Sequence, residues 1–289
     1  MIYLLLSIFA SSWILITFKL FAKYNIDTQQ AIIVNYVIAC ISGLVAYTEP
    51  IDIISITKSS WFYGTIALGF IFILVFNFMA ITTQKNGLSV AAVASKMSVA
   101  IPVIFGIIVY NEITGALKII GIIIALIAVY MTSMKTVGGI AIKKENLIYP
   151  LLVFLGGGII DTSLKFMETN YVAKMDVPIF SATIFSFAAI LGIFTLAYKA
   201  AKGTLKINVK NIIAGICLGI PNYFSIYFLI QALRNENIDS STVFIINNVA
   251  VLLVSTFAGI LFFKEKLLLK NWIGIVLAIM SILFVTFSI

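Results

Sequence analysis

The sequence predicts an all-α polytopic membrane protein with ten transmembrane helices arranged as two inverted five-helix repeats. Hydrophobic residues make up 62% of the 289 residues and charged residues only 10%, a balance that excludes a soluble domain of this length. Apolar stretches of bilayer-spanning length recur along the whole chain. The two halves of the chain also resemble each other in sequence.

Each predicted span is close to the roughly 20 apolar residues that a helix needs to cross a bilayer. The ten spans are residues 2–22, 29–48, 61–82, 88–110, 114–133, 147–165, 178–199, 210–231, 239–262 and 269–288. The breaks between them contain mostly Gly, Asn, Asp, Pro or Lys, as loops do. The longest connection separates the halves, so we assign residues 1–138 to the first repeat and 139–289 to the second.

A shift of 153 residues aligns parts of the two halves without a gap. The matches include Gly106 with Gly259, Glu112 with Glu265, and Ile120-Gly121-Ile122 with Ile273-Gly274-Ile275. Shared membrane composition explains the isoleucines, but less easily the glycines and glutamates together. Because each half has an odd number of helices, the second would enter the membrane upside-down. Inverted repeats are a transporter architecture, with the substrate site between them near the bilayer midplane.

The basic residues are distributed unequally between the two sides of the predicted bundle. The loops and helix ends that follow the odd-numbered spans contain thirteen lysines: Lys19, Lys23, Lys85, Lys135, Lys143, Lys144, Lys199, Lys202, Lys206, Lys210, Lys264, Lys266 and Lys270. The opposite side has four basic residues: Lys58, Lys118, Lys174 and Arg234. The positive-inside rule therefore places both termini outside, in a bacterial inner membrane. The net charge of +8 indicates topology and attraction to the bilayer, and no nucleic-acid partner is expected.

Lys96 lies inside the fourth predicted span, eight residues after the apolar run begins at Leu88. A rise of about 1.5 Å per residue places it roughly 12 Å into the helix. A lysine at this depth costs roughly 2.5–3.5 kcal/mol even on the lenient insertion scale, so it needs a polar cavity or a partner. Pro102 cannot donate a backbone hydrogen bond to Ser98, which gives the helix a soft point. Together they predict a moving helix that handles a polar ligand.

Asp161 is the acidic residue of the membrane interior, four residues before Lys165 on the sixth predicted span. That spacing puts both on one helical face, where they can form an ion pair. The alternative is that Asp161 carries protons or is the counter-ion of Lys96. Gly157 and Gly158 precede it and are expected to let another helix approach closely.

Asparagine side chains supply the remaining polar candidates of the predicted membrane interior. Asn247 and Asn248 form a pair of amides in mid-span that need hydrogen-bond partners. Lys96 aligns with Val249, so only the first half has the charge, which fits substrate chemistry better than scaffolding. The other candidates for a cavity lining are Asn222 and Tyr223, followed by Asn77, Trp13, Asn35 and Tyr36.

Other features of the sequence are interpreted as structural. Glu112 and Glu265 precede the fifth and tenth helices, where a carboxylate suits a helix N-terminus. The pairs Gly121/Ala125 and Gly274/Ala278 in those two helices predict packing surfaces or a homodimer interface. There is no histidine, and the two cysteines lie far apart in apolar segments. We therefore expect no metal site, no cofactor and no histidine-dependent catalysis.

On these features the chain resembles the drug/metabolite transporter superfamily, specifically its EamA-type transporters. The matching motifs are Pro102 with Glu112, the Asn111-Glu112 and Lys264-Glu265 pairs, the two Ile-Gly-Ile triplets, and the run from Trp13 to Lys19. The resemblance implies a central cavity formed by helices 1–4 and 6–9, peripheral helices 5 and 10, and transport of metabolites such as amino acids. It also implies cytoplasmic termini, opposite to the orientation that the lysines predict.

The leading hypothesis is a secondary transporter of a small polar metabolite, amino-acid-like or otherwise carboxylate-bearing, that works by alternating access. Lys96 would bind the anionic group, the asparagines would bind polar parts, and Asp161 would couple protons. The alternatives are a lipid-handling membrane protein or an intramembrane enzyme, although no recognisable catalytic motif is present. The buried Lys96 and Asp161 argue against a purely structural subunit.

Overall fold

The computed structural model describes residues 1–86, 88–112, 115–133, 146–205, 207–235, 238–264 and 267–287, and within these ranges every regular element is a helix. The α-helices are α1 (Ile2–Lys23), α2 (Thr28–Ala46), α3 (Ile53–Lys58), α4 (Phe62–Asn86), α5 (Leu88–Met97), α6 (Ala100–Val109), α7 (Ala116–Ser133), α8 (Ile148–Asn170), α9 (Val177–Ala201), α10 (Val209–Leu233), α11 (Ser240–Phe263) and α12 (Leu269–Thr286). A 3₁₀ turn, η2 (Lys174–Asp176), precedes α9.

The long helices have the length and composition of membrane spans. Eight helices within the described ranges are long and apolar enough to cross a bilayer, and two apolar helical stretches, Val93–Val109 and Ala116–Met131, are shorter. Large apolar side chains also cover the outside of the bundle, among them Phe9, Phe194 and Leu261. Such a surface suits hydrocarbon and not water. The prediction of an all-α polytopic membrane protein is therefore confirmed.

Polar residues mark the starts of several helices, as the sequence chemistry requires. The Asp27 carboxylate accepts hydrogen bonds from the backbone N–H groups of Gln29 and Gln30 at the start of α2. Asp52 does the same for α3, and Asn208 does so for α10. These caps satisfy N–H groups that have no partner inside their own helix.

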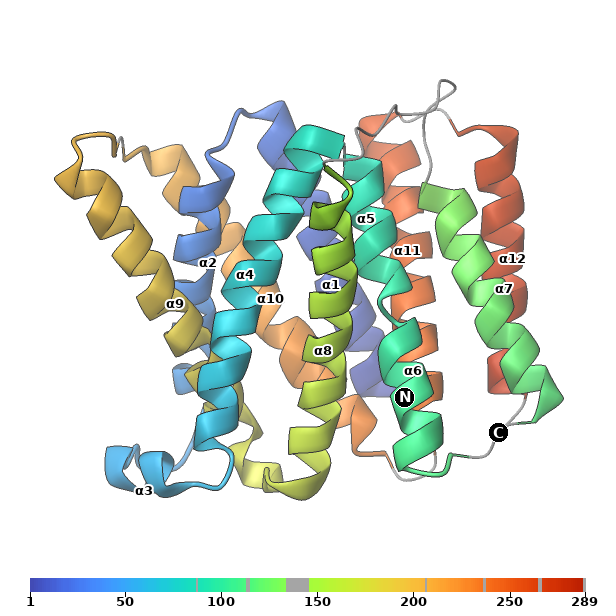
Figure 1. Cartoon of the computed structure of the whole chain (residues 1–289), viewed down its shortest axis with the longest axis horizontal. Helices are drawn as coiled ribbons and strands as arrows, with labels where there is room; N and C mark the ends of the chain where they lie inside the picture. Colours follow the sequence, from blue (N-terminus) through green and yellow to red (C-terminus); the bar gives the residue numbers. More distant parts are fainter. Residues whose placement is uncertain are drawn as a thin grey trace.

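The helices stand side by side in one bundle, with both termini toward the same end (Figure 1). The paired helices α7 and α12 form one edge and α9 the opposite edge, while α1, α4, α5, α8, α10 and α11 lie between (Figure 1). A Cβ atom added to Gly121 would lie 2.7 Å from Cγ2 of Val285. Ala125 and Ala278 are fully buried. The small residues of α7 and α12 thus pack against each other within one chain, and a homodimer through these helices stays a prediction.

Three consecutive glycines bring α8 close to its neighbours. A Cβ atom at Gly156 would lie 2.3 Å from Val75 of α4, and one at Gly157 would lie 3.0 Å from the Ser98 hydroxyl. A Cβ atom at Gly158 would lie 2.3 Å from Cδ1 and 2.6 Å from Cβ of Ile101. The absence of side chains at these three glycines therefore permits the close helix approach.

The fourth predicted span is broken into two helices at the place that the proline predicts. α5 ends at Met97 and α6 begins at Ala100. Because Pro102 has no N–H to offer, the Ser98 carbonyl accepts instead from Ile101 at 3.0 Å. The predicted soft point therefore exists, and it lies directly after Lys96.

The glycine packing gives a first testable prediction. Gly158→Ala should lower the thermal stability of the purified protein in detergent, because its Cβ would clash with the Cβ of Ile101, which cannot swing away. Overpacking of this kind costs about 1–3 kcal/mol. Gly115→Ala is the matched control, since a Cβ atom there meets nothing within 4 Å. Equal melting temperatures for the two variants would contradict the packing described for α8.

Candidate functional site

A cavity of about 180 Å³ lies midway along the central helices. Its walls come from α1, α4, α5, α8, α10 and α11, so both halves of the chain contribute. The polar lining consists of Ser11, Ser95, Lys96, Ser98, Asp161, Asn222, Ser225, Asn247 and Asn248. Apolar residues that include Phe18, Phe72 and Leu229 complete it. The resemblance also implied contributions from helices 2 and 7, but α2 and α9 supply none of the described lining residues.

Lys96 enters this cavity from the last turn of α5. Its Nζ donates a hydrogen bond of 3.3 Å to Oδ1 of Asn248 on α11, while Nδ2 of Asn248 donates to the Phe244 carbonyl at 3.1 Å. The contact joins the two halves of the chain at the level of the helix break. Its partner is a neutral amide, which leaves the lysine charge without a directly bonded anion among the described residues.

Asp161 lines the same cavity from α8. The predicted ion pair between Asp161 and Lys165 is wrong, because Lys165 Nζ bonds Glu168 Oε2 at 3.0 Å and the Leu233 carbonyl at 3.0 Å. Lys165 lies one turn closer to the end of the bundle, where the last carbonyls of α10 lack helical partners and attract a cation. Asp161 forms no hydrogen bond or ion pair within the described ranges, so its carboxylate faces the cavity.

Two further amides of the cavity have defined partners. Asn247 Oδ1 accepts a hydrogen bond of 3.1 Å from the Ser7 hydroxyl on α1. Asn222 Nδ2 donates to Asn35 Oδ1 at 3.1 Å. The cavity therefore brings together a cation, a carboxylate and three amides, which are the groups that recognise a small polar ligand with charged ends.

The remaining sequence candidates lie away from this cavity. Tyr36 is fully buried and its hydroxyl donates to the Phe72 carbonyl, while Tyr223 is buried against Tyr227. Asn77 donates to Ile73 of its own helix at 2.7 Å. Trp13 is 54% exposed on the outside of α1. Their proposed contact with a ligand is not supported by their positions.

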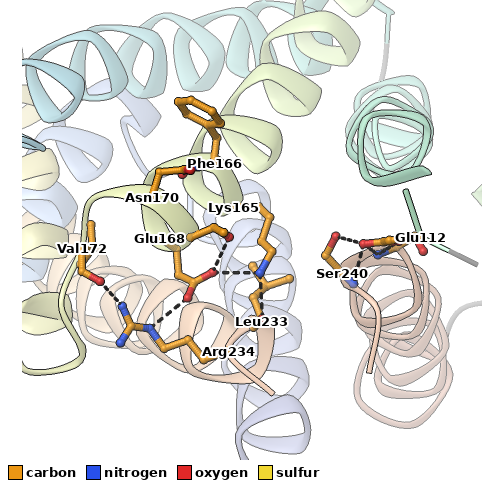
Figure 2. Close-up of polar contacts among 11 residues, drawn as sticks. Glu112, Lys165, Phe166, Glu168, Asn170, Val172, Leu233, Arg234 and Ser240 are labelled. Atoms are coloured by element: carbon orange, nitrogen blue, oxygen red, sulfur yellow. Dashed lines mark hydrogen bonds and ion pairs between the residues drawn. The ribbon is translucent and has the colours of Figure 1, made fainter. Parts of the chain in front are cut away.

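A second, larger cavity of about 680 Å³ opens at the terminus side of the bundle, and we call it the vestibule. Lys165, Glu168 and Arg234 form a cluster on one of its walls (Figure 2). Glu168 Oε1 lies 3.1 Å from Nε of Arg234, and Arg234 also donates to the Val172 carbonyl. The lysine of α8 thus caps the end of α10, and the arginine after α10 binds the loop that follows α8. These contacts join the two helices at the vestibule.

Glu112 lies in the vestibule wall that contains the start of α11 (Figure 2). Its Oε1 accepts from the Ser240 backbone N–H at 2.9 Å and from the Ser240 hydroxyl, and its Oε2 accepts from Ser241 N–H at 3.1 Å. A role at a helix N-terminus was predicted, but the helix is α11 and not the one that follows Glu112 in sequence. Asn111, directly before Glu112, has a positive φ of 50°. Glu265, assigned the corresponding role, lies outside the described residues.

Several polar contacts were not expected from the sequence. Lys118 is 1% exposed and pairs with Asp239 at 2.6 Å and with Glu112 at 3.8 Å, although its position suggested a loop charge. The spacing of Lys165 and Glu168 at i and i+3 could have indicated their pairing. No local signal marks Ser7, whose partners lie more than 200 residues away. Among the described residues no group of three or more His, Cys, Asp or Glu could hold a metal ion.

The chain is similar to a family model, to a bacterial protein sequence and to a solved structure. Residues 148–287 match the EamA-like transporter family. An uncharacterized protein of Haemophilus influenzae is 29% identical over 293 residues, which cover 96% of this chain and 95% of that protein. A protein of known crystal structure has a TM-score of 0.79 over 99% of this chain and 96% of its own, at 12% identity, which shows a shared fold. The resemblance to EamA-type transporters in the sequence is confirmed over residues 148–287.

The capping by Glu112 gives a second prediction. Glu112→Ala should destabilise the protein by about 1–2 kcal/mol, because the first N–H groups of α11 lose their acceptor. The measurement is thermal unfolding of the purified protein in detergent. Glu49→Ala is the control, since Glu49 is exposed. An unchanged melting temperature for Glu112→Ala would show that the carboxylate does not hold α11.

Proposed function

We propose that the chain is a secondary transporter that moves a small carboxylate-bearing metabolite by alternating access. The premise is the match of residues 148–287 to a transporter family. The observation that carries this proposal is the polar cavity in the middle of the bundle, where Lys96 lies directly before a break in its helix. A charged residue at membrane depth marks a substrate or ion pathway more often than a structural contact.

The proposal includes ten membrane-crossing helices in two inverted repeats, residues 1–138 and 139–289. Eight long apolar helices and two shorter apolar stretches make ten, if α5 and α6 are counted as one span. Asn111 and Lys264 lie 153 residues apart and share a φ of 50°, which is uncommon for residues other than glycine. The contact between Lys96 and Asn248 then joins the equivalent helices of the two repeats. A site between inverted repeats is the arrangement that alternating access uses.

Lys96 is the proposed ligand of the substrate carboxylate. Its hydrogen bond to Asn248 is 3.3 Å long and offers no negative charge. A carboxylate would form a shorter bond, about 2.8 Å long, and would add the attraction of an opposite charge. The cavity of about 180 Å³ is below the roughly 300–1,000 Å³ of typical ligand pockets, so the substrate is small.

Asp161 is the proposed proton carrier. It lines the same cavity as Lys96 and has no bonded partner within the described residues, so it can gain or lose a proton as the cavity changes its contents. The break at Ser98 and Val99 would allow α5 to move relative to α6 while the glycines of α8 keep the helices in contact. This bending would expose the central cavity first to one side of the membrane and then to the other.

The third prediction tests the carboxylate site. Lys96→Met keeps the length of the side chain and removes its charge, so the protein should fold at least as well as the parent because the desolvation cost disappears. Uptake of carboxylate-bearing substrates into proteoliposomes should fall to background. Lys58→Met, which removes an exposed lysine of α3, is the matched control and should transport normally.

A permanent ion pair with Asp161 would give the opposite pattern for Lys96→Met. Stability would fall because a buried carboxylate would be left unpaired, and the double variant Lys96→Met/Asp161→Asn would recover both folding and transport. Full recovery of transport in that double variant would rule out Lys96 as the substrate ligand.

The fourth prediction concerns orientation in a bacterial inner membrane. The lysine distribution places both termini outside, so a C-terminal alkaline phosphatase fusion should be active and a C-terminal GFP fusion should be dark. Fluorescence of the GFP fusion would instead support the cytoplasmic termini that the family resemblance implies.

A further inference from the structure

A third cavity, of about 260 Å³, is lined by α2, by α3 and the residues before it, by the start of α4 and by α9, and we call it the outer groove. It opens on the outside of the bundle, because its lining residues Ile51, Ile53 and Ile190 are 53%, 72% and 47% exposed. None of its lining residues lines the central cavity or the vestibule. The outer groove therefore faces the bilayer and is separate from the site described above.

The lining of the outer groove is apolar in its chemistry. It contains no charged or amide side chain, and apart from one thiol its polar groups are the hydroxyls of Thr57, Thr183 and Ser186. The Thr183 hydroxyl donates to the Ile179 carbonyl and the Ser186 hydroxyl to the Thr183 carbonyl, each at 2.7 Å, while Thr57 donates to Ile54 at 3.0 Å. All three hydroxyls thus use their donor on their own helix, and what remains for an occupant is a surface that suits hydrocarbon.

The short helix α3 brings a positive charge to the outer groove. α3 lies at the end of the bundle that also holds both termini (Figure 1), the level at which a membrane protein meets lipid headgroups. Lys58 in its last turn is exposed, directly follows Thr57, and has no hydrogen bond or ion pair to the part of the chain that the structure describes. The Asp52 carboxylate at the start of α3 is already satisfied, because it accepts from the Ile54 N–H at 2.9 Å and from the Ser55 hydroxyl at 2.6 Å.

An apolar groove open to the bilayer, with a lysine beside it at headgroup level, is complementary to an acyl chain that carries a phosphate. We propose that a membrane phospholipid occupies the outer groove, with an acyl chain against α2 and α9 and its phosphate bound by Lys58. The lipid fills the space between α3 and α9 and holds α3 at this edge of the bundle. Because the outer groove and the central cavity share no lining residue, the lipid lies outside the transport pathway.

The first experiment uses the wild-type protein in proteoliposomes and two matched photo-reactive probes. One is phosphatidylethanolamine with a diazirine in an acyl chain, and the other is diacylglycerol with the same chains and no phosphate. Mass spectrometry of the labelled peptides should show phosphatidylethanolamine on the outer groove at least about fivefold more than on the exposed face of α12, and diacylglycerol on the groove about fivefold less than phosphatidylethanolamine. Equal labelling of the groove and α12 would overturn the proposal, because it would show general contact with the bilayer only. Equal labelling of the groove by both probes would contradict the phosphate contact.

The second experiment fills the outer groove and removes its charge in separate variants. Ser186→Trp places an indole in the groove and should lower phosphatidylethanolamine labelling of α2 and α3 to the level of α12. Thr195→Trp is the matched control, since Thr195 lies on the same helix, is exposed outside the groove lining, and like Ser186 bonds its own helix.

Lys58→Met should lower phosphatidylethanolamine labelling of the groove about fivefold and leave diacylglycerol labelling unchanged. Unchanged phosphatidylethanolamine labelling in Lys58→Met would contradict the phosphate contact, and unchanged labelling in Ser186→Trp would contradict occupation of the groove. Because Lys58 is exposed, its substitution tests the proposal even if Ser186→Trp does not fold.

Discussion

The charge of Lys96, placed inside an apolar helix, is the constraint on which the rest of the structure depends. The cost of that charge requires polar neighbours in the middle of the bundle, and α11 supplies them with Asn248 while α8 supplies Asp161. The glycines of α8 permit the close helix packing that brings these side chains near Lys96. The neighbouring break between α5 and α6 leaves backbone groups with altered partners beside the same cavity. One buried cation therefore accounts for the carboxylate and the amide beside it, while Pro102 accounts for the bend.

A second set of charges holds the bundle together at its terminus side. Lys165 satisfies the carbonyl of Leu233, the last residue of α10, Arg234 donates to the carbonyl of Val172 just after α8, and Glu168 pairs with both cations. Across the vestibule, Glu112 satisfies the first N–H groups of α11. These contacts use charge to complete helix ends, which is a structural task, whereas Lys96 and Asp161 in the central cavity complete no helix end. The difference separates scaffolding charges from candidate ligands.

The sequence predicted the features that depend on local pattern and missed those that depend on distant partners. The all-α membrane fold, the soft point before Pro102 and the close approach at Gly158 follow from hydropathy, a missing N–H and a missing Cβ. The pairing of Asp161 with Lys165 was wrong because Lys165 bonds Glu168 of its own helix and the Leu233 carbonyl of α10, and spacing along α8 cannot reveal the second partner. The target of Glu112 was assigned to the wrong helix for the same reason, since α11 is distant in sequence and adjacent in space.

A structure of the purified protein with leucine bound would test the central claim most directly. The account predicts the carboxylate within about 3 Å of Lys96 Nζ, in place of the present bond to Asn248. Leucine bound in the vestibule, with Lys96 still bonded to Asn248, would contradict it.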